Sequence, residues 1–198
     1  MTWLNWPNRI TIARIALITP FVICLLNLNA GWTGWRYLSL VLFVIMAASD
    51  GLDGFLARRL GESTPLGRFL DPVADKLLIT CSVILLALDD TAVHGFRLPN
   101  WVPVIAIGKD VLIVIGFGLV YATTGQFFVQ PRIWGKACTL VQLVMVGFSL
   151  LAPDLPAPVQ RLWPVLWWAA SGVAIIALVD YVRVGNRFAA GQQNGVTN

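Results

Sequence analysis

Four of the ten acidic residues in this 198-residue chain fall within one short stretch, arranged as two pairs. Asp50 and Asp53 are three positions apart, and Asp71 and Asp75 are four apart. On a helix either spacing places both side chains on the same face. The segment between the pairs, Arg59–Pro65, is short, so the two helices that carry them should be antiparallel neighbours. The pattern therefore predicts four carboxylates that converge on one point.

Four carboxylates at close range repel one another unless bound cations offset their charge. A set of oxygen ligands favours a hard ion such as Mg²⁺ or Mn²⁺. Gly54 and Gly67 each lie close to an acidic residue, where a small residue lets a ligand or a neighbouring helix approach the backbone. Arg58 lies beside the carboxylates and can bind phosphate. Together these residues indicate a site for metal ions and a diphosphate.

Three other interpretations of the acidic residues stay open at this point. They could be incidental charges in a solvated loop beside the membrane. They could line an ion or proton pathway, as ionisable groups within membranes often do. They could also belong to a non-catalytic membrane scaffold, which would tolerate alanine at all four aspartates.

The composition points to lipid as the environment of the helices. Hydrophobic residues make up 58% of the chain and charged residues only 12%, against about 25% charged in a typical soluble domain. Six apolar runs have the length that a bilayer requires, so we expect an all-α integral membrane fold with six transmembrane helices. The first run is too long for a signal peptide and is interpreted as a retained span. The expected spans are 9–28, 37–57, 66–88, 102–121, 134–151 and 162–182.

Basic residues set the expected orientation. Most of them fall on one side of the predicted spans, which places both termini in the cytoplasm by the positive-inside rule. A short amphipathic segment should precede the first span, the membrane domain should cover 1–185, and 186–198 should form a disordered polar tail. We attribute the net charge of +4 to this asymmetry and not to the binding of nucleic acid. Three dispersed cysteines and one histidine provide neither a zinc motif nor a disulfide framework.

At the acidic stretch the sequence resembles the CDP-alcohol phosphatidyltransferase family. The family pattern is D-x-x-D-G-x-x-A-R, eight residues, then G-x-x-x-D-x-x-x-D. This chain matches every fixed position of the pattern, and the six-span layout agrees over nearly the whole chain. The matching residues are Asp50, Asp53, Gly54, Ala57, Arg58, Gly67, Asp71 and Asp75.

The resemblance implies a phosphatidyl transfer from CDP-diacylglycerol to an alcohol, with release of CMP. By analogy the four aspartates hold two ions of Mg²⁺ or Mn²⁺, and Asp75 is also the general base. The resemblance further implies a homodimer in a bacterial-type inner membrane, with the active site at the cytoplasmic face. The residues that it assigns to CDP binding are Asn8, Thr11, Gly54, Ala57, Arg58 and Gly67. Asn8 and Thr11 could instead be a helix cap and an interface anchor.

Two branches of the family, which use different acceptor alcohols, resemble this chain. The residues of the fourth and fifth predicted spans favour one of them. The branch that uses glycerol 3-phosphate carries two further basic residues where this chain has Phe117 and Cys138. A dianionic phosphate needs several donors, whereas phosphatidylglycerol is a monoanionic diester. The run Gly108–Val111 also resembles the cardiolipin branch. We therefore expect phosphatidylglycerol as the acceptor, with glycerol 3-phosphate as the alternative and a transporter as a remote one.

Lys109 and Lys136 are the expected acceptor-binding residues. Lys109 could alternatively form a buried ion pair with Asp110 that only holds helices together. Lys136 could be an ordinary lysine of the positive-inside pattern.

Overall fold

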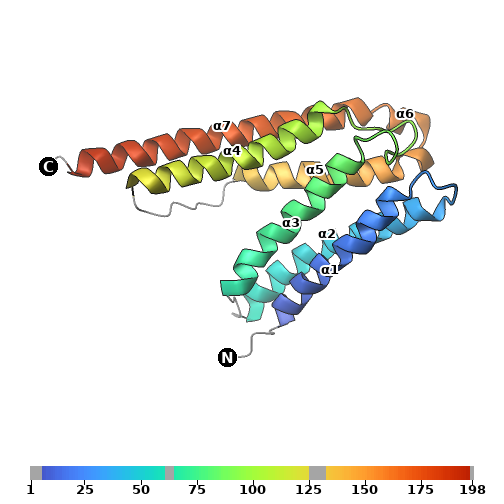
Figure 1. The fold of residues 1–198 in the computed structure, drawn as a ribbon, viewed down its shortest axis with the longest axis horizontal. Helices are drawn as coiled ribbons and strands as arrows, with labels where there is room; N and C mark the ends of the chain where they lie inside the picture. Colours follow the sequence, from blue (N-terminus) through green and yellow to red (C-terminus); the bar gives the residue numbers. More distant parts are fainter. Residues whose placement is uncertain (1–5, 61–64, 125–132, 197–198) are drawn as a thin grey trace.

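The computed structural model describes the backbone of residues 6–60, 65–124 and 133–196, and the side chains of 9–50, 70–122 and 133–186. Every regular element in these ranges is helical (Figure 1). The long helices are α1 (Trp6–Leu26), α2 (Gly34–Leu60), α3 (Pro65–Leu85), α4 (Trp101–Thr124), α5 (Ile133–Leu151) and α7 (Trp163–Val196). A short 3₁₀ helix, η1 (Ala152–Asp154), and α6 (Ala157–Gln160) lie between α5 and α7.

Proline and glycine account for several helix boundaries. Pro65 is the first residue of α3, a position where the missing N–H costs nothing because it has no helical partner. The turn between α1 and α2 contains Gly31 with a φ of 83°, and the α3–α4 loop contains Gly95 with a φ of 79°. Residues with a side chain rarely adopt this backbone conformation. These turns connect successive antiparallel helices at one end of the bundle.

The helices form two groups that meet near the connecting loops (Figure 1). One group is α1, α2 and α3, in which α1 packs against both others. The second group is α4, α5 and α7, in which α7 packs against both others. The start of α1 and the end of α7 lie away from the loops that join α1 to α2 and α3 to α4. The two groups therefore diverge toward the ends that carry the chain termini.

One hydrophobic core joins the two groups. It contains fully buried residues from α1, α2, α3 and α5, among them Phe21, Met46, Val83 and Met145. Phe21 and Phe43 place their ring centroids 6.1 Å apart, which adds an aromatic contact between α1 and α2. The relative position of α1, α2 and α3 is thus set by close packing, which matters because these three helices carry the acidic residues.

The outer surface of the helices is largely apolar, as expected for helices in lipid. On α4, Val104 is 69% exposed and Val114 is 70% exposed, a pattern unfavourable in water. Among the described residues, four segments are long and apolar enough to cross a membrane: Arg9–Leu26, Trp101–Ala122, Ile133–Asp154 and Ala157–Asn186. The chain is therefore an all-helical integral membrane protein.

The predicted spans and the observed helices agree in position, with differences at the ends. Six long helices occupy the six predicted runs, but the four membrane segments found do not include α2 and α3, which carry the acidic pairs. The count of six spans and the cytoplasmic termini remain predictions. The tail was expected to be disordered from 186, whereas α7 continues to Val196 because no proline interrupts this stretch. The expected N-terminal amphipathic segment lies mostly in 1–5, outside the described residues.

Candidate functional site

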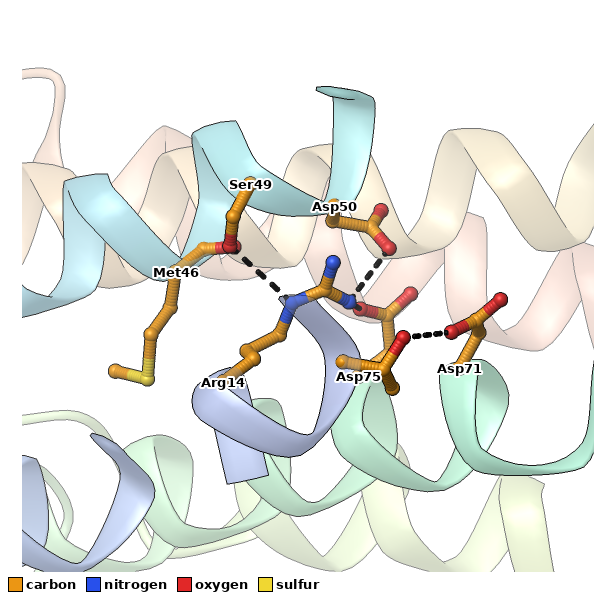
Figure 2. A network of polar contacts seen from close by, with 7 residues as sticks. Arg14, Met46, Ser49, Asp50, Asp71 and Asp75 are labelled. Carbon is orange, nitrogen blue, oxygen red and sulfur yellow. Dashed lines mark hydrogen bonds and ion pairs between the residues drawn. The ribbon is translucent and has the colours of Figure 1, made fainter. Parts of the chain in front are cut away.

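The acidic residues of α2 and α3 are brought to one site by α1, which packs against both helices. Asp50 lies on α2, and Asp71 and Asp75 lie on α3, inside a helix that continues past Pro72. Asp50 and Asp75 contact the guanidinium of Arg14, which reaches them from α1, whereas the carboxylate of Asp71 accepts a hydrogen bond from Thr11 (Figure 2). The site is thus built from three helices, and α1 contributes the basic group that contacts the carboxylates.

Arg14 is the central contact of this site. Its Nη1 donates to Asp50 Oδ1 at 2.8 Å, and the same nitrogen lies 3.5 Å from Asp75 Oδ1. The arginine side chain is fully buried, whereas Asp50 and Asp75 are 38% and 30% exposed. A buried cation is costly without anionic partners, so Arg14 needs these carboxylates as much as they need a positive charge. The predicted convergence is therefore observed for Asp50 and Asp75, which share one nitrogen.

Ser49 orients the arginine from the side opposite the carboxylates. Arg14 Nε donates to Ser49 Oγ at 3.3 Å, and the hydroxyl of Ser49 donates to the carbonyl of Met46 at 2.8 Å (Figure 2). Because the only hydroxyl proton of Ser49 is directed at Met46, its oxygen is left to accept from the guanidinium. The arginine is thus held at both ends of its guanidinium group.

Asp71 has a different kind of partner. The hydroxyl of Thr11 donates to Asp71 Oδ1 at 2.6 Å, and Thr11 is only 1% exposed. Thr11 and Arg14 are three positions apart on α1, so both side chains point at the acidic helices from one face. The predicted role of Thr11 in nucleotide binding stays a prediction. What the structure adds is a hydrogen bond from an uncharged hydroxyl of α1 to the third acidic residue.

The donor set fits hard divalent cations, although the carboxylates are separated by the guanidinium. Within the described side chains, no three Asp, Glu, His or Cys residues are placed to hold a metal ion together. Arg14 Nη1 lies between Asp50 and Asp75, and the carboxylate of Asp53 is outside the described side chains. Asp50 and Asp75 share one guanidinium and Asp71 has only a hydroxyl partner among the described contacts, so negative charge is in excess, and oxygen ligands are those that Mg²⁺ and Mn²⁺ prefer. The chemistry of the residues present therefore suits such ions.

Most of the residues predicted to bind the nucleotide fall where only the backbone is described. They lie on helices that border the carboxylates, at the end of α2, the start of α3 and the first turn of α1. Their roles remain predictions. These residues are Asn8, Gly54, Ala57, Arg58 and Gly67.

A second polar cluster adjoins the acidic site on the other side of α3. Lys109 Nζ lies 2.7 Å from Asp110 Oδ1, and Lys76 Nζ donates to the same oxygen. Lys76 follows Asp75 directly in α3, and consecutive residues on a helix point about 100° apart. Asp75 therefore faces α1 and α2 while Lys76 faces α4. We call these three residues the Lys76–Asp110–Lys109 triad.

The triad lines a cavity of about 550 Å³ between α3, α4, α5 and α7. This volume is in the usual range for small-molecule sites. Thr80, Gly135 and Tyr181 also line it, together with apolar residues of α4. The cavity lies on the Lys76 side of α3, so α3 separates it from the carboxylates around Arg14.

The two predicted acceptor-binding lysines lie in different surroundings. Lys109 is 6% exposed and lines the cavity as part of the triad. It also forms the ion pair with Asp110 that the sequence left open as an alternative. Lys136 is exposed, near the start of α5, and the described lining of the cavity includes its neighbour Gly135 instead. The acceptor-binding roles of Lys109 and Lys136 both remain predictions.

Two features of the site were missed by reasoning from the sequence. The first is the pairing of Arg14 with Asp50 and Asp75, and the second is the junction of Lys76 with Asp110. The position of Arg14 one helical turn after Thr11 was a possible signal for the first pairing. The sequence offered no signal for the contact of Lys76 with Asp110, because 34 positions separate these residues.

Comparison with known proteins identifies relatives of this chain. The chain matches the model of the CDP-alcohol phosphatidyltransferase family over residues 4–182. It is 38% identical over 161 residues to a CDP-diacylglycerol–glycerol-3-phosphate 3-phosphatidyltransferase of Bacillus subtilis, covering 77% of this chain and 79% of that protein. A protein of the same name from Pseudomonas fluorescens is 33% identical over 186 residues, covering 91% of this chain and 89% of the relative.

A relative with another name matches over a similar range. The CMP-forming cardiolipin synthase of Oryza sativa is 30% identical over 190 residues, covering 91% of this chain and 57% of that protein. The family match covers α1 to α5 and most of α7, and it includes every acidic residue of the site. The chain therefore belongs to the CDP-alcohol phosphatidyltransferase family.

Proposed function

We propose that this protein transfers the phosphatidyl group of CDP-diacylglycerol to the hydroxyl of glycerol 3-phosphate and releases CMP, using Mg²⁺ or Mn²⁺. The observation that carries this proposal is the convergence of Asp50 and Asp75 on one buried arginine, with Asp71 bound to Thr11 of the same helix, next to a cavity that two lysines line. An anionic cluster suits cations that bind a diphosphate, and an adjoining basic cavity suits an anionic acceptor.

The choice of acceptor rests on the relatives. The Bacillus and Pseudomonas proteins are both named for glycerol 3-phosphate, and so is a relative from Aquifex aeolicus that is 34% identical over 184 residues. Reasoning from the sequence favoured phosphatidylglycerol, with glycerol 3-phosphate as the alternative. The names of the relatives favour the alternative.

Phosphatidylglycerol is a second candidate because of two side chains near the cavity. Cys138 is fully buried at a position where the glycerophosphate branch carries a basic residue. Phe117, at the other such position, packs against Tyr181 with ring centroids 5.5 Å apart. Neither residue can donate strongly to a phosphate. The rice relative named as a cardiolipin synthase is consistent with this second candidate.

The residues of the site have distinct proposed roles. Asp50, Asp53, Asp71 and Asp75 would hold the cations, which when bound would offset the charge of the diphosphate and of the departing CMP. Asp75 accepts the proton of the attacking hydroxyl as the new oxygen–phosphorus bond forms and the bond to CMP breaks. Arg14 fixes the orientation of Asp75, and Lys109 holds the acceptor in the cavity.

The setting of the reaction follows from the same assignment. The acyl chains of CDP-diacylglycerol would stay in lipid against the apolar outer faces of the helices. We infer that the site opens to the cytoplasm in a bacterial inner membrane, that both termini lie on that side, and that the protein is a homodimer. The position of Thr11 and Arg14 in the first half of α1, toward the N-terminal end of the bundle, is consistent with this orientation.

The acceptor can be identified by one reconstitution experiment. Purified protein in detergent or liposomes is given CDP-diacylglycerol with Mg²⁺ or Mn²⁺, and then glycerol 3-phosphate or phosphatidylglycerol. We expect CMP release and a lipid product with the mass of phosphatidylglycerophosphate, and no release in excess chelator. A product with the mass of cardiolipin would select the second candidate.

A transport function makes the opposite prediction for the same preparation. Ion flux into liposomes, without CMP release from CDP-diacylglycerol in the presence of either acceptor, would refute the transferase. Turnover that persists in excess chelator would refute the metal requirement while leaving the family assignment intact.

A further inference from the structure

Three serines of α2 and α3 share one kind of local hydrogen bond, and one of them has a second partner. The hydroxyls of Ser39 and Ser82 each donate to the carbonyl oxygen four positions earlier, at 2.8 and 2.7 Å. Ser49 donates in the same way to the carbonyl of Met46, three positions earlier, at 2.8 Å. Such a bond satisfies a hydroxyl inside an apolar helix. Of these three serines, only Ser49 also accepts a hydrogen bond from a side chain in the described part of the chain, from Arg14 Nε at 3.3 Å.

The contact at Nε influences where the rest of the Arg14 guanidinium lies. This group is planar and rigid, so its nitrogens keep fixed positions relative to one another. Nη1 lies 2.8 Å from Asp50 Oδ1 and 3.5 Å from Asp75 Oδ1. A tilt of the plane after loss of the Nε contact would change both distances. Ser49 therefore helps to hold Nη1 between the two carboxylates (Figure 2).

Arg14 cannot easily replace this partner. Its side chain is fully buried, so water has poor access to Nε once the hydroxyl is removed. The only proton of the Ser49 hydroxyl is directed at the carbonyl of Met46, so its oxygen presents a lone pair to the arginine. Because this acceptor is uncharged, it orients the guanidinium without competing with the carboxylates for its positive charge.

We propose that Ser49 is a positioning residue for the transfer reaction, which acts through Arg14 on the carboxylate of Asp75. The inference rests on the proposed function, because that function makes Asp75 the base for the attacking hydroxyl. A base must lie within hydrogen-bond reach of the proton that it accepts, and a misplacement of about 1 Å can lower the rate by roughly a hundredfold. Ser49 contacts neither substrate in this assignment, so its loss should lower kcat and leave the KM values nearly unchanged.

A purely local role for Ser49 is the competing explanation. Ser49 would then only satisfy its own hydroxyl within α2, and its loss would have no specific effect on turnover. Ser39 provides the matched control, because it lies on the same helix and makes the same kind of bond to the preceding turn. No side chain in the described ranges donates to its hydroxyl.

The test measures kcat, and KM for CDP-diacylglycerol and for glycerol 3-phosphate, in Ser49→Ala, Ser49→Thr and Ser39→Ala. We expect Ser49→Ala to lower kcat on the order of tenfold, the value of one hydrogen bond to a charged group, with KM values within about twofold of wild type. Threonine keeps a hydroxyl that can bond to the preceding turn, so Ser49→Thr should stay within about threefold of the wild-type kcat. Ser39→Ala should have the wild-type kcat. Equal kcat values for Ser49→Ala and Ser39→Ala, or equal losses in Ser49→Ala and Ser49→Thr, would overturn the proposal.

The contact with Arg14 can also be tested without turnover, by a double-mutant cycle on the midpoint of thermal unfolding in detergent. Ser49→Ala should lower the midpoint of the wild-type protein by more than it lowers the midpoint of Arg14→Met, whose side chain has no donor. Ser39→Ala should cause the same shift in both backgrounds. Equal shifts for Ser49→Ala in the two backgrounds would show that Ser49 does not hold the arginine, and would overturn the inference.

The proposed function and this inference can fail separately. If the wild-type protein releases no CMP with either acceptor, the proposed function is wrong, and the double-mutant cycle alone decides whether Ser49 holds Arg14. If the wild-type protein releases CMP and Ser49→Ala does so with an unchanged kcat, the proposed function stands and the inference is wrong.

Discussion

Replacing Asp71 with asparagine should lower the rate of CMP release from CDP-diacylglycerol by roughly a thousandfold, while the protein still folds and inserts. An effect of this size corresponds to about 4 kcal/mol of transition-state stabilisation, the order expected when a charged ligand of catalytic cations is lost. The measurement is the initial rate of CMP release by purified protein at saturating Mg²⁺ or Mn²⁺. Folding is checked by the thermal unfolding midpoint in detergent.

Asp71 is the best of the acidic residues for this test because of its partner. Its described contact is the hydroxyl of Thr11, which can donate equally well to the amide oxygen of asparagine. Asp50 and Asp75 both contact Arg14, so neutralising either one would also disturb a buried guanidinium. The Asp71→Asn variant therefore removes charge with little loss of structure.

Two further variants separate charge from hydrogen bonding at this position. Thr11→Val removes the donor to Asp71 but keeps the carboxylate, and its rate should fall only about tenfold, the value of one hydrogen bond to a charged group. Asp89→Asn makes the same substitution at the loop end of the bundle and should leave the rate unchanged. Full turnover in Asp71→Asn would show that this carboxylate has no part in the chemistry.

The helices were predictable because lipid imposes a length on apolar runs. The fourth run was expected over 102–121 and forms Trp101–Thr124, and the fifth was expected over 134–151 and forms Ile133–Leu151. The two small helices η1 and α6 were not predicted, since a few local backbone bonds in a proline-rich connection leave no periodic pattern. Helix ends were less predictable because the termini depend on local capping and not on hydrophobicity.

The acidic part of the site was predictable for a similar reason, and the basic part was not. The intervals between the aspartates, with a short connection, were enough to predict that α2 and α3 bring carboxylates to one site, although α1 packs against both helices and its Arg14 lies between Asp50 and Asp75. Which cation would face them depended on how α1 packs between these helices, and 36 positions separate Arg14 from Asp50. The same holds for Lys76 and Asp110, whose contact is created by the packing of α3 against α4. Pairings between distant helices are not encoded in local spacing.

Replacing Arg14 with glutamine should destabilise the protein strongly when divalent cations are absent. The guanidinium is fully buried and lies between two carboxylates, so its removal leaves like charges facing each other without compensation. Removing one partner of a buried ion pair typically costs about 3–5 kcal/mol. The midpoint of thermal unfolding, followed by tryptophan fluorescence in chelator, should therefore fall well below that of the wild-type protein.

Cations should restore much of this loss, because they can supply the positive charge that Arg14 provides. Ions that bind only the folded state raise its stability in proportion to the logarithm of their concentration. We therefore expect Mg²⁺ or Mn²⁺ to raise the unfolding midpoint of Arg14→Gln by more than it raises that of the wild-type protein. A larger cation-induced rise in the unfolding midpoint for Arg14→Gln than for the wild-type protein would indicate a cation bound among the carboxylates. The lower midpoint of the variant in chelator would not indicate this by itself.

A second arginine provides the matched control for this experiment. Arg36 also connects two helices, through Asp154 at 2.8 Å and the carbonyl of Leu150 at 3.0 Å, but it lies near the loop end of the bundle. Arg36→Gln should lower the unfolding midpoint to the same extent with and without divalent cations. If Arg14→Gln behaved in the same way, the carboxylates around Arg14 would be partners of that arginine alone, and the cations proposed here would have to bind elsewhere.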